Sequence, residues 1–329
     1  MINNFAGISR TQPGVMMNWK RKATFQNLVA ALPGADTIYY AMQRTVGSCR
    51  PGRLPTRDWL EAAALLVTWV EGAGRSVVGG RFLEIGTGRN VTLPLALWLW
   101  GARSVVTVDL NTYLSNALVM ESLKYLRAHK DEVTALFGAR AETGEFKERF
   151  GKLMSFSGNL KSLMDLAAIR YLAPADAKQL PLPDHSFDFH VSHAVFEHIP
   201  AVDLLGILRE ARRLLVSGGL LYHVIDPSDH FSHDDASITG VNFLQFDDRE
   251  WERLAGNRFT YHNRLRSFEH QNLLAQAGVR VIRQSETSDE ASLLALSNGF
   301  PLHPQFSHVS HEALAVRSLN VLGTFADQD

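Results

Sequence analysis

Apolar positions recur at two different periods along the chain, and these periods separate the expected helices from the expected strands. Leu60, Val67 and Val70 recur at helical spacing within residues 58–72. From residue 81 onward, short apolar or β-branched runs alternate with helical stretches, an order that is typical of parallel sheets. Strands are expected at residues 81–85, 104–110, 169–173, 187–193, 219–224 and 279–283.

Helical patterns fill the intervals between these strands and precede the first of them. Helices are expected at 58–72, 91–100, 202–215, 249–254 and 268–277, with a mainly helical insertion at about 112–170. We predict an α/β fold with a Rossmann-like, doubly wound and mostly parallel seven-stranded sheet, an N-terminal helical extension and this insertion. The expected units are an arm with a helix at 1–76 that serves as a cap or oligomerisation element, a core at 77–285, and a tail at 286–329 that packs on the core. Within this arm, residues 1–55 carry four prolines and predict an extended segment with one or two short helices.

Composition narrows the classes of protein. The chain of 329 residues is 46% hydrophobic, which is enough to form a packed core, and its formal net charge of −1 argues against a general electrostatic grip on nucleic acid. The single cysteine, Cys49, excludes an internal disulfide and a multi-cysteine zinc site. No leader-like segment is visible, and no apolar stretch approaches the roughly 20 residues of a membrane helix. We therefore expect a cytoplasmic protein without a membrane or nucleic-acid partner.

The first chemical signal is the turn after the first expected strand. Gly86 and Gly88 allow a ligand to approach the backbone closely, and the following helix N-terminus offers free N–H groups. Asp109 ends the next strand, where a carboxylate can accept both hydroxyls of a ribose. The dinucleotide fingerprint has a third glycine where this chain has Val91, and Glu84 would repel a pyrophosphate but suit an ammonium group. These features favour an adenosine-containing ligand other than NAD(P).

A further motif at residues 176–188 reads DAKQLPLPDHSFD. With this motif and the glycine turn, residues 77–226 resemble the class I S-adenosylmethionine-dependent methyltransferases, of the bacterial small-molecule or saccharide type. The resemblance implies that Glu84 and the glycine backbone border the methionine part of the cofactor, that Asp109 binds the ribose, and that Asp176 meets the adenine. The implied cofactor contacts are Glu84, Gly86, Thr87, Gly88, Asn90, Asp109, Leu110, Asp176, Ala177 and His193. The family often has a small residue after Gly88, so Arg89 leaves the shape of the turn open.

Catalytic residues are expected after the fourth and fifth strands, because ligands of open α/β sheets lie beyond the carboxyl ends of the strands. Residues 223–235 hold three histidines and four aspartates. Asp226, His230 and His233 are the expected catalytic group, joined by His193 at the end of the fourth strand. Three interpretations stay open: acceptor binding with a His/Asp base, a divalent metal site, or a solvated loop. The spacing matches no metal motif, so a metal is not favoured, but Asp226, His230 and His233 would be its ligands.

Residues on the acceptor side are expected at His198 and in the segment 242–266, whose Asn-Arg-Leu-Arg stretch is similar to one in bacterial small-molecule methyltransferases. Arg264 and Arg266 alternate, so on a strand they would face the same side and grip a carboxylate or phosphate. Alternatively, they form surface salt bridges with nearby acidic residues, and Glu197 and His198 only fix their loop. The expected substrate residues are His198, Tyr261, Arg264 and Arg266.

The sequence therefore predicts methyl transfer from S-adenosylmethionine to a small molecule, with a hydroxyl of a metabolite or saccharide favoured. The transfer is expected to be a direct displacement assisted by a His/Asp base. The alternatives are an NAD(P)-dependent oxidoreductase, a non-catalytic partner subunit with the same fold, and an RNA methyltransferase, which the near-neutral charge disfavours. A homodimer is compatible with the sequence.

Overall fold

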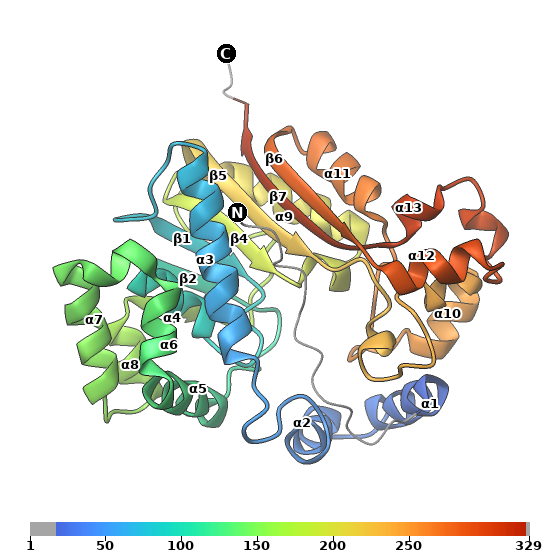
Figure 1. Ribbon diagram of the computed structural model, residues 1–329, viewed down its shortest axis with the longest axis horizontal. Helices are drawn as coiled ribbons and strands as arrows, with labels where there is room; N and C mark the ends of the chain where they lie inside the picture. The colour runs from blue at the N-terminus through green and yellow to red at the C-terminus, as the bar shows by residue number, and fades with distance from the viewer. Residues whose placement is uncertain (1–17, 327–329) are drawn as a thin grey trace.

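The computed structural model describes residues 18–326, and a seven-stranded sheet forms its centre (Figure 1). The strand order is β3-β2-β1-β4-β5-β7-β6. The strands are β1 (Arg81–Ile85), β2 (Ser104–Val108), β3 (Ile169–Leu172), β4 (Phe187–His193), β5 (Leu215–Ile225), β6 (Val279–Ser288) and β7 (Val316–Phe325). The first five run parallel, whereas β7 is antiparallel to both β5 and β6. The predicted doubly wound, mostly parallel sheet is thus confirmed.

Helices cover both faces of the sheet, because successive side chains of a strand point to opposite faces. Phe82 on β1 is buried in one hydrophobic core, and its neighbour Leu83 is buried in the other. The Phe82 face is covered by α3 (Thr56–Gly72), α4 (Thr92–Leu99) and the insertion, and the Leu83 face by α9 (Ala201–Leu214) and α11 (Ser267–Gln276). Each core lies between the sheet and the helices that cover one of its faces, so the ends of the strands stay accessible to loops.

The insertion between β2 and β3 is helical, as the sequence predicts. It consists of α5 (Asn116–Ala128), α6 (Lys130–Leu136), the 3-10 helix η1 (Gly138–Glu142), α7 (Gly144–Ser155) and α8 (Leu160–Leu166). At the start of α7, the side chain of Thr143 accepts a hydrogen bond from the backbone N–H of Phe146, whose ring is buried in the first core. The insertion therefore belongs to the packed body of the protein.

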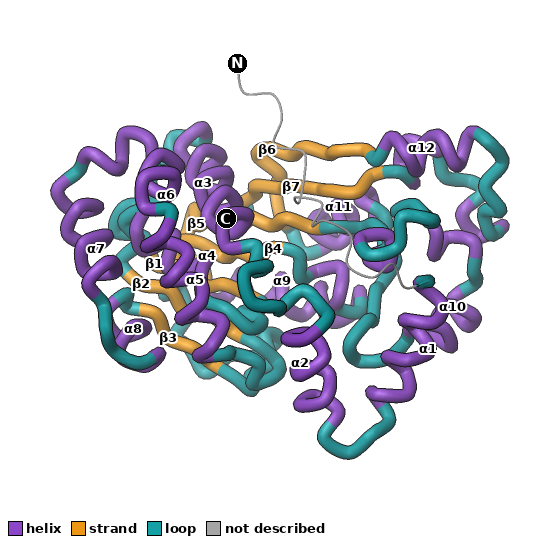
Figure 2. The backbone as a smooth tube through the Cα atoms, turned by 60° about the horizontal axis from the view of Figure 1, so that its bottom comes forward, coloured by secondary structure: helices purple, strands orange, loops and turns teal. Residues whose placement is uncertain are grey.

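Two helices of the N-terminal arm, α1 (Trp19–Ala30) and α2 (Ala35–Thr45), begin the described part of the chain. Residues 1–17 of the expected arm and residues 327–329 of the expected tail lie outside the described part. The ring of Trp19 lies 5.7 Å from that of Phe231 and 6.1 Å from that of Trp251 on α10 (Asp248–Ala255), in a third hydrophobic cluster. Figures 1 and 2 show α1 beside α10. The arm is thus packed against the segments that follow β5.

The tail differs from the prediction, because it supplies a strand to the sheet. After α12 (Glu290–Ser297), the 3-10 helix η5 (Pro304–Phe306) and the single-turn α13 (His311–Leu314), β7 enters between β5 and β6. Leu319 and Leu322 on β7 are fully buried. The packed core therefore extends beyond residue 285. Among the described residues, no helix is both long and apolar enough to cross a bilayer.

The order of the strands reverses between β1 and β4. From β1 the chain continues to β2 and β3 on one side, and later to β4 and β5 on the other. At such a point the loops after the two central strands diverge to opposite faces and leave a crevice at their carboxyl ends. A ligand site is therefore expected between the loops that follow β1 and β4.

Candidate active site

Two glycines make possible the sharp turn that follows β1. Gly86 and Gly88 adopt φ values of 87° and 59°, in the region that other residues rarely adopt. A Cβ atom on Gly86 would lie 2.4 Å from Cγ2 of Val195, in the loop after β4. A Cβ atom on Gly88 would meet no described atom within 4 Å. Gly86 thus lets the two loops touch, and Gly88 leaves space for a ligand beside the backbone.

Two acidic side chains flank this turn. Glu84 on β1 is buried and accepts a hydrogen bond of 2.5 Å from the hydroxyl of Thr107. Burial raises the pKa of Glu84 to about 8, against the effect of the Thr107 hydrogen bond and with a contribution from the Asp109 charge. Asp109 accepts hydrogen bonds from the backbone N–H groups of Gly88 at 2.8 Å and Asn111 at 2.9 Å, and burial raises its pKa. At neutral pH the Glu84 carboxyl in the crevice is therefore mostly protonated, and it lies beside the turn that Asp109 hydrogen-bonds.

Arg89, the departure from the family pattern, is held between two aromatic rings. Its guanidinium carbon lies 4.7 Å from the ring centre of Tyr40 and 4.8 Å from that of Tyr113. Tyr40 belongs to α2, and its hydroxyl lies 2.7 Å from Oγ of Ser115. The arm is thereby fastened beside the glycine turn.

The other expected cofactor residues near the turn differ in exposure. Thr87 and Asn90 are buried, and their side chains are hydrogen-bonded to β2 and α5 respectively. If these two residues contact a ligand, they therefore do so through their backbone atoms. Exposed or half-buried are Leu110, Asp176 and Ala177.

The expected catalytic residues converge after β5. Oδ2 of Asp226 lies 3.4 Å from Nε2 of His230 and 3.5 Å from Nε2 of His233, both on the 3-10 helix η3 (His230–His233). Burial alone would raise the pKa of Asp226, but the two imidazoles outweigh it and hold this pKa well below its usual range. Burial likewise opposes the charged form of His233, but Asp226 and the neighbouring carboxylates raise its pKa overall. The structure therefore brings these three residues into one group.

Two further side chains lie beside this group at the end of β4. Burial lowers the pKa of His193, the last residue of β4, to about 4 despite the nearby Asp226 carboxylate. Glu197, on the 3-10 helix η2 (Phe196–His198), is fully buried, and neither of its carboxyl oxygens has a hydrogen-bond partner among the described residues. Burial, and then the charge of Asp226, raise the pKa of Glu197 well above its ordinary value. The sequence indicated Glu197 only as a residue that fixes its loop, whereas the structure places a buried carboxyl with a raised pKa beside Asp226.

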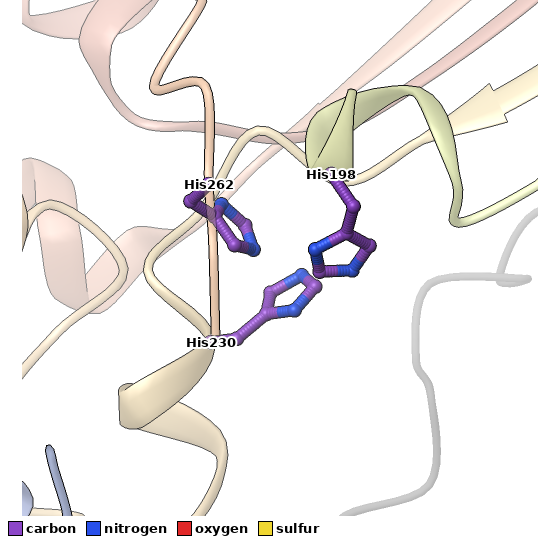
Figure 3. A group of neighbouring side chains, drawn as sticks. All are labelled: His198, His230 and His262. Carbon is purple, nitrogen blue, oxygen red and sulfur yellow. The ribbon is translucent and has the colours of Figure 1, made fainter. Parts of the chain in front are cut away.

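His198 and His230 meet a third imidazole, that of His262 (Figure 3). Nδ1 of His198 is hydrogen-bonded at 2.9 Å to the backbone carbonyl of Tyr261, so the expected substrate residue Tyr261 also orients a histidine. Burial, followed by the charges of His230 and His198, lowers the pKa of His262 well below its ordinary value. Sequence analysis gave His262 no role, and its only signal was its place in a polar segment next to Tyr261.

The expected arrangement of Arg264 and Arg266 is wrong, because the segment between α10 and α11 forms no strand. Arg264 has a positive φ of 56° and donates to the backbone carbonyls of Phe243 and Phe246, and it forms an ion pair with Asp248. Arg266 is only 1% exposed, and its guanidinium donates to backbone carbonyls, including that of Pro227. The two guanidinium groups thus hold the loops around the site together. The alternative of a salt bridge to a nearby acidic residue is confirmed for Arg264.

Residues 154–223 match the family model described as "Methyltransferase domain". This segment runs from α7 into β5 and includes the motif at 176–188. The match and the strand order agree with the predicted class I S-adenosylmethionine-dependent methyltransferase fold, with S-adenosylmethionine as the cofactor.

Solved structures with a similar arrangement have low sequence identity to this chain. An S-adenosylmethionine-dependent methyltransferase from Methanosarcina mazei is 15% identical, with 76% of this chain and 93% of that chain covered and a TM-score of 0.43. A putative sarcosine dimethylglycine methyltransferase from Galdieria sulphuraria is 16% identical, with 84% and 88% covered and a TM-score of 0.45. Magnesium protoporphyrin IX methyltransferase from Synechocystis, solved with bound S-adenosylhomocysteine, is 13% identical, with 94% and 100% covered and a TM-score of 0.46. No curated protein matches the sequence.

Proposed function

We propose that this protein transfers the methyl group of S-adenosylmethionine to a hydroxyl of a small metabolite or saccharide. The observation that carries the proposal is the group of Asp226, His230 and His233 at the carboxyl end of β5. It lies on the edge of the sheet where the glycine turn touches the loop after β4 through Gly86 and Val195. An imidazole that is oriented by a carboxylate can act as the base that takes the proton of an acceptor hydroxyl.

The residues of the crevice fit the cofactor. The open space at Gly88 accommodates a ligand against the backbone, and we propose that Glu84 meets the ammonium group of the methionine part. Asp109 is proposed to bind the ribose hydroxyls with the oxygen lone pairs left beside its two backbone hydrogen bonds. The exposed side chain of Asp176 is proposed to accept a hydrogen bond from the adenine amino group, with Ala177 beside the ring.

When bound, S-adenosylmethionine supplies a methyl group on a positively charged sulfur. In the proposed reaction His233 or His230, oriented by Asp226, takes the proton of the acceptor hydroxyl. The cofactor would supply the methyl carbon for the new bond to the acceptor oxygen, and its sulfur would keep the electron pair of the carbon–sulfur bond that breaks. His193, at the end of β4, is proposed to line the space between acceptor and sulfur. Most of the acceleration would come from alignment and from the exclusion of water.

We propose that the arm covers the acceptor side of the site. The ring of Tyr39 on α2 stacks on that of Phe259 with centres 4.2 Å apart, and Asp36 forms an ion pair with Arg258. Since Tyr40 contacts Arg89 beside the glycine turn, α2 bridges the cofactor turn and the segment that carries His262. A cover of this kind suits a small acceptor better than a long nucleic acid, and the near-neutral net charge agrees with this.

The test is to incubate the protein with isotopically labelled S-adenosylmethionine and a panel of hydroxylated metabolites and sugars, and to locate the label by mass spectrometry. We expect an oxygen-linked methyl group, and a fall in turnover of about 100-fold or more for Asp226→Asn, which leaves the imidazoles without their carboxylate. Asp165→Asn, on the exposed surface of α8, should behave as the wild type. Label on nitrogen or carbon, or full activity of Asp226→Asn, would contradict the proposal. Binding of NAD in place of S-adenosylmethionine would favour an oxidoreductase, and cofactor binding that Asp109→Ala abolishes without loss of biological activity would favour a non-catalytic subunit.

A further inference from the structure

Three histidines from separate parts of the chain direct their rings at one another beside the candidate active site (Figure 3). His198 lies on η2 after β4, His230 begins η3 after β5, and His262 lies in the irregular segment between α10 and α11. The ring centres of His230 and His262 are 4.1 Å apart, those of His198 and His262 are 4.7 Å apart, and those of His198 and His230 are 5.0 Å apart. One ring nitrogen from each histidine lies within 4.8 Å of the other two.

The hydrogen bonds of these rings leave nitrogen lone pairs free in the centre of the group. A carbonyl oxygen only accepts, so Nδ1 of His198 must donate to Tyr261, and its Nε2 then carries a lone pair. Nε2 of His262 is buried, on a residue that is 7% exposed, and has no hydrogen-bond partner in the described part of the chain. Nε2 of His230 makes no well-aligned hydrogen bond there, and its nearest charged neighbour is Oδ2 of Asp226 at 3.4 Å. Buried nitrogens without partners are unfavourable, so a missing ligand would account for them.

A carboxylate stands at the edge of the same group. Oδ1 of Asp226 accepts hydrogen bonds from the backbone N–H and the hydroxyl of Ser228, at 2.9 Å and 2.5 Å. Oδ2 is thereby turned to His230, at 3.4 Å from its Nε2. Asp226 thus offers a carboxylate oxygen next to His230, and Ser228 fixes its orientation.

We propose that His198, His230 and His262, with Asp226, bind one divalent transition-metal ion of the Zn²⁺ class. Imidazole nitrogens suit Zn²⁺, Co²⁺ and similar ions, whereas Mg²⁺ and Ca²⁺ prefer oxygen donors. Ligand nitrogens at 2.0–2.1 Å from a tetrahedral ion are about 3.3 Å apart, so the rings have to move inward by about 1 Å. The ion would lie beside His233, which stays free to act as the base. Its use in polarising an acceptor hydroxyl rests on the proposed function, whereas its binding does not.

The experiment measures metal binding by the full-length protein after removal of metals with a chelator. Co²⁺ is titrated into the protein while visible absorbance is recorded, and Zn²⁺ affinity is determined by competition with a chromophoric chelator. We expect one equivalent of Co²⁺ with the intense bands of tetrahedral coordination, displaced by Zn²⁺. His262→Asn and His198→Asn should each weaken Zn²⁺ binding by about 100-fold or more, since even a residue that only supports a ligand changes affinity 10–100-fold.

His270→Asn is the matched control, because His270 is also buried with an unpartnered Nε2 but lies on α11, outside the group. It should bind Zn²⁺ as the wild type does. His198 is exposed, so its variant is expected to fold even where loss of buried His262 impairs folding, which thermal unfolding would reveal. Wild-type protein that binds no Co²⁺, or binding that His198→Asn leaves unchanged, would overturn the metal site. Calorimetry with S-adenosylhomocysteine on the same samples separates this failure from a failure of the proposed function.

Discussion

Glu84 shows at the scale of one residue how burial sets the charge of a side chain in the candidate site. Its pKa of about 8 means that the carboxyl is mostly protonated at pH 7 before any ligand arrives. A carboxyl in that state does not repel an incoming ligand and does not leave a buried charge unpaired. An ammonium group placed beside it would favour the ionised form.

Binding of S-adenosylhomocysteine near pH 7 should therefore release about one proton from Glu84, because the ligand's ammonium group lowers the pKa of this carboxyl. Calorimetry in buffers of different ionisation enthalpy measures the number of protons. The amide side chain of Glu84→Gln cannot ionise, so in this variant the binding enthalpy should no longer contain this buffer-dependent contribution. Any remaining dependence on the buffer would come from other titrating groups. A wild-type enthalpy that is the same in every buffer would show that Glu84 does not meet the ammonium group.

How much of the site the sequence could predict depended on separation along the chain. Asp226, His230 and His233 lie within one loop, so their convergence was predictable from spacing alone. His262 reaches the same group from an irregular segment whose course is fixed by buried Arg264 and Arg266, and no local pattern predicts such a course. The sequence around Arg264 and Arg266 predicted anion binding, because a sequence shows the charge of a guanidinium group. It does not show the backbone carbonyls that this group binds in the folded protein.

At the scale of elements, the loops after β1 and β4 touch where the order of the strands reverses, and this contact defines the turn after β1. Val195 packs on Gly86 because glycine has no Cβ, and the positive φ of Gly86 adds a second reason for glycine at this position.

Gly86→Ala should lower the free energy of unfolding by about 2–5 kcal/mol, from about 1–2 for the left-handed backbone and about 1–3 for the clash with Val195. The double variant with Val195→Ala should recover the steric contribution, so the two substitutions should couple by about 1–3 kcal/mol in denaturant unfolding. The Cβ atom that Gly88→Ala adds would meet open space, so this variant should lower the free energy of unfolding only by the backbone contribution. Additive effects of Gly86→Ala and Val195→Ala would argue against a contact between the two loops.

Most strands were predictable because each has a local apolar run, and the one from 187 to 193 has the predicted bounds. β7 was missed, because polar Ser318, Asn320 and Thr324 interrupt its apolar positions. Its place depends on pairing with β5, about 100 residues earlier in the chain, and such long-range pairing is not encoded in a local pattern.

At the scale of the whole molecule, buried neutral histidines make stability depend on pH. Burial, with a smaller contribution from Arg266, lowers the pKa of His270 to about 3 from the value of 6.5 expected in the unfolded chain. Between these values the unfolded chain binds a proton that the folded protein does not. The contribution of His270 to stability is therefore fully present above pH 6.5 and is lost as the pH falls toward 3.

His270→Gln removes this titrating group. Between pH 6.5 and pH 5, the free energy of unfolding of the wild type should fall more steeply than that of the variant, by about 1.4 kcal/mol per pH unit at most. Denaturant unfolding at several pH values measures the two slopes, and the comparison of slopes is independent of any constant loss caused by the substitution. Parallel curves would mean that His270 titrates normally in the folded protein.

The central claim is that the cofactor lies along the carboxyl edge of β1 and β4 with its sulfur facing the Asp226 group. The most direct measurement is a crystal structure with S-adenosylhomocysteine bound. We predict ribose hydroxyls at Asp109, the amino group at Glu84, and a sulfur atom that faces His193, Asp226 and His233 across a space wide enough for a small acceptor. A sulfur atom that faces away from these side chains, or a ligand bound elsewhere on the sheet, would contradict the account.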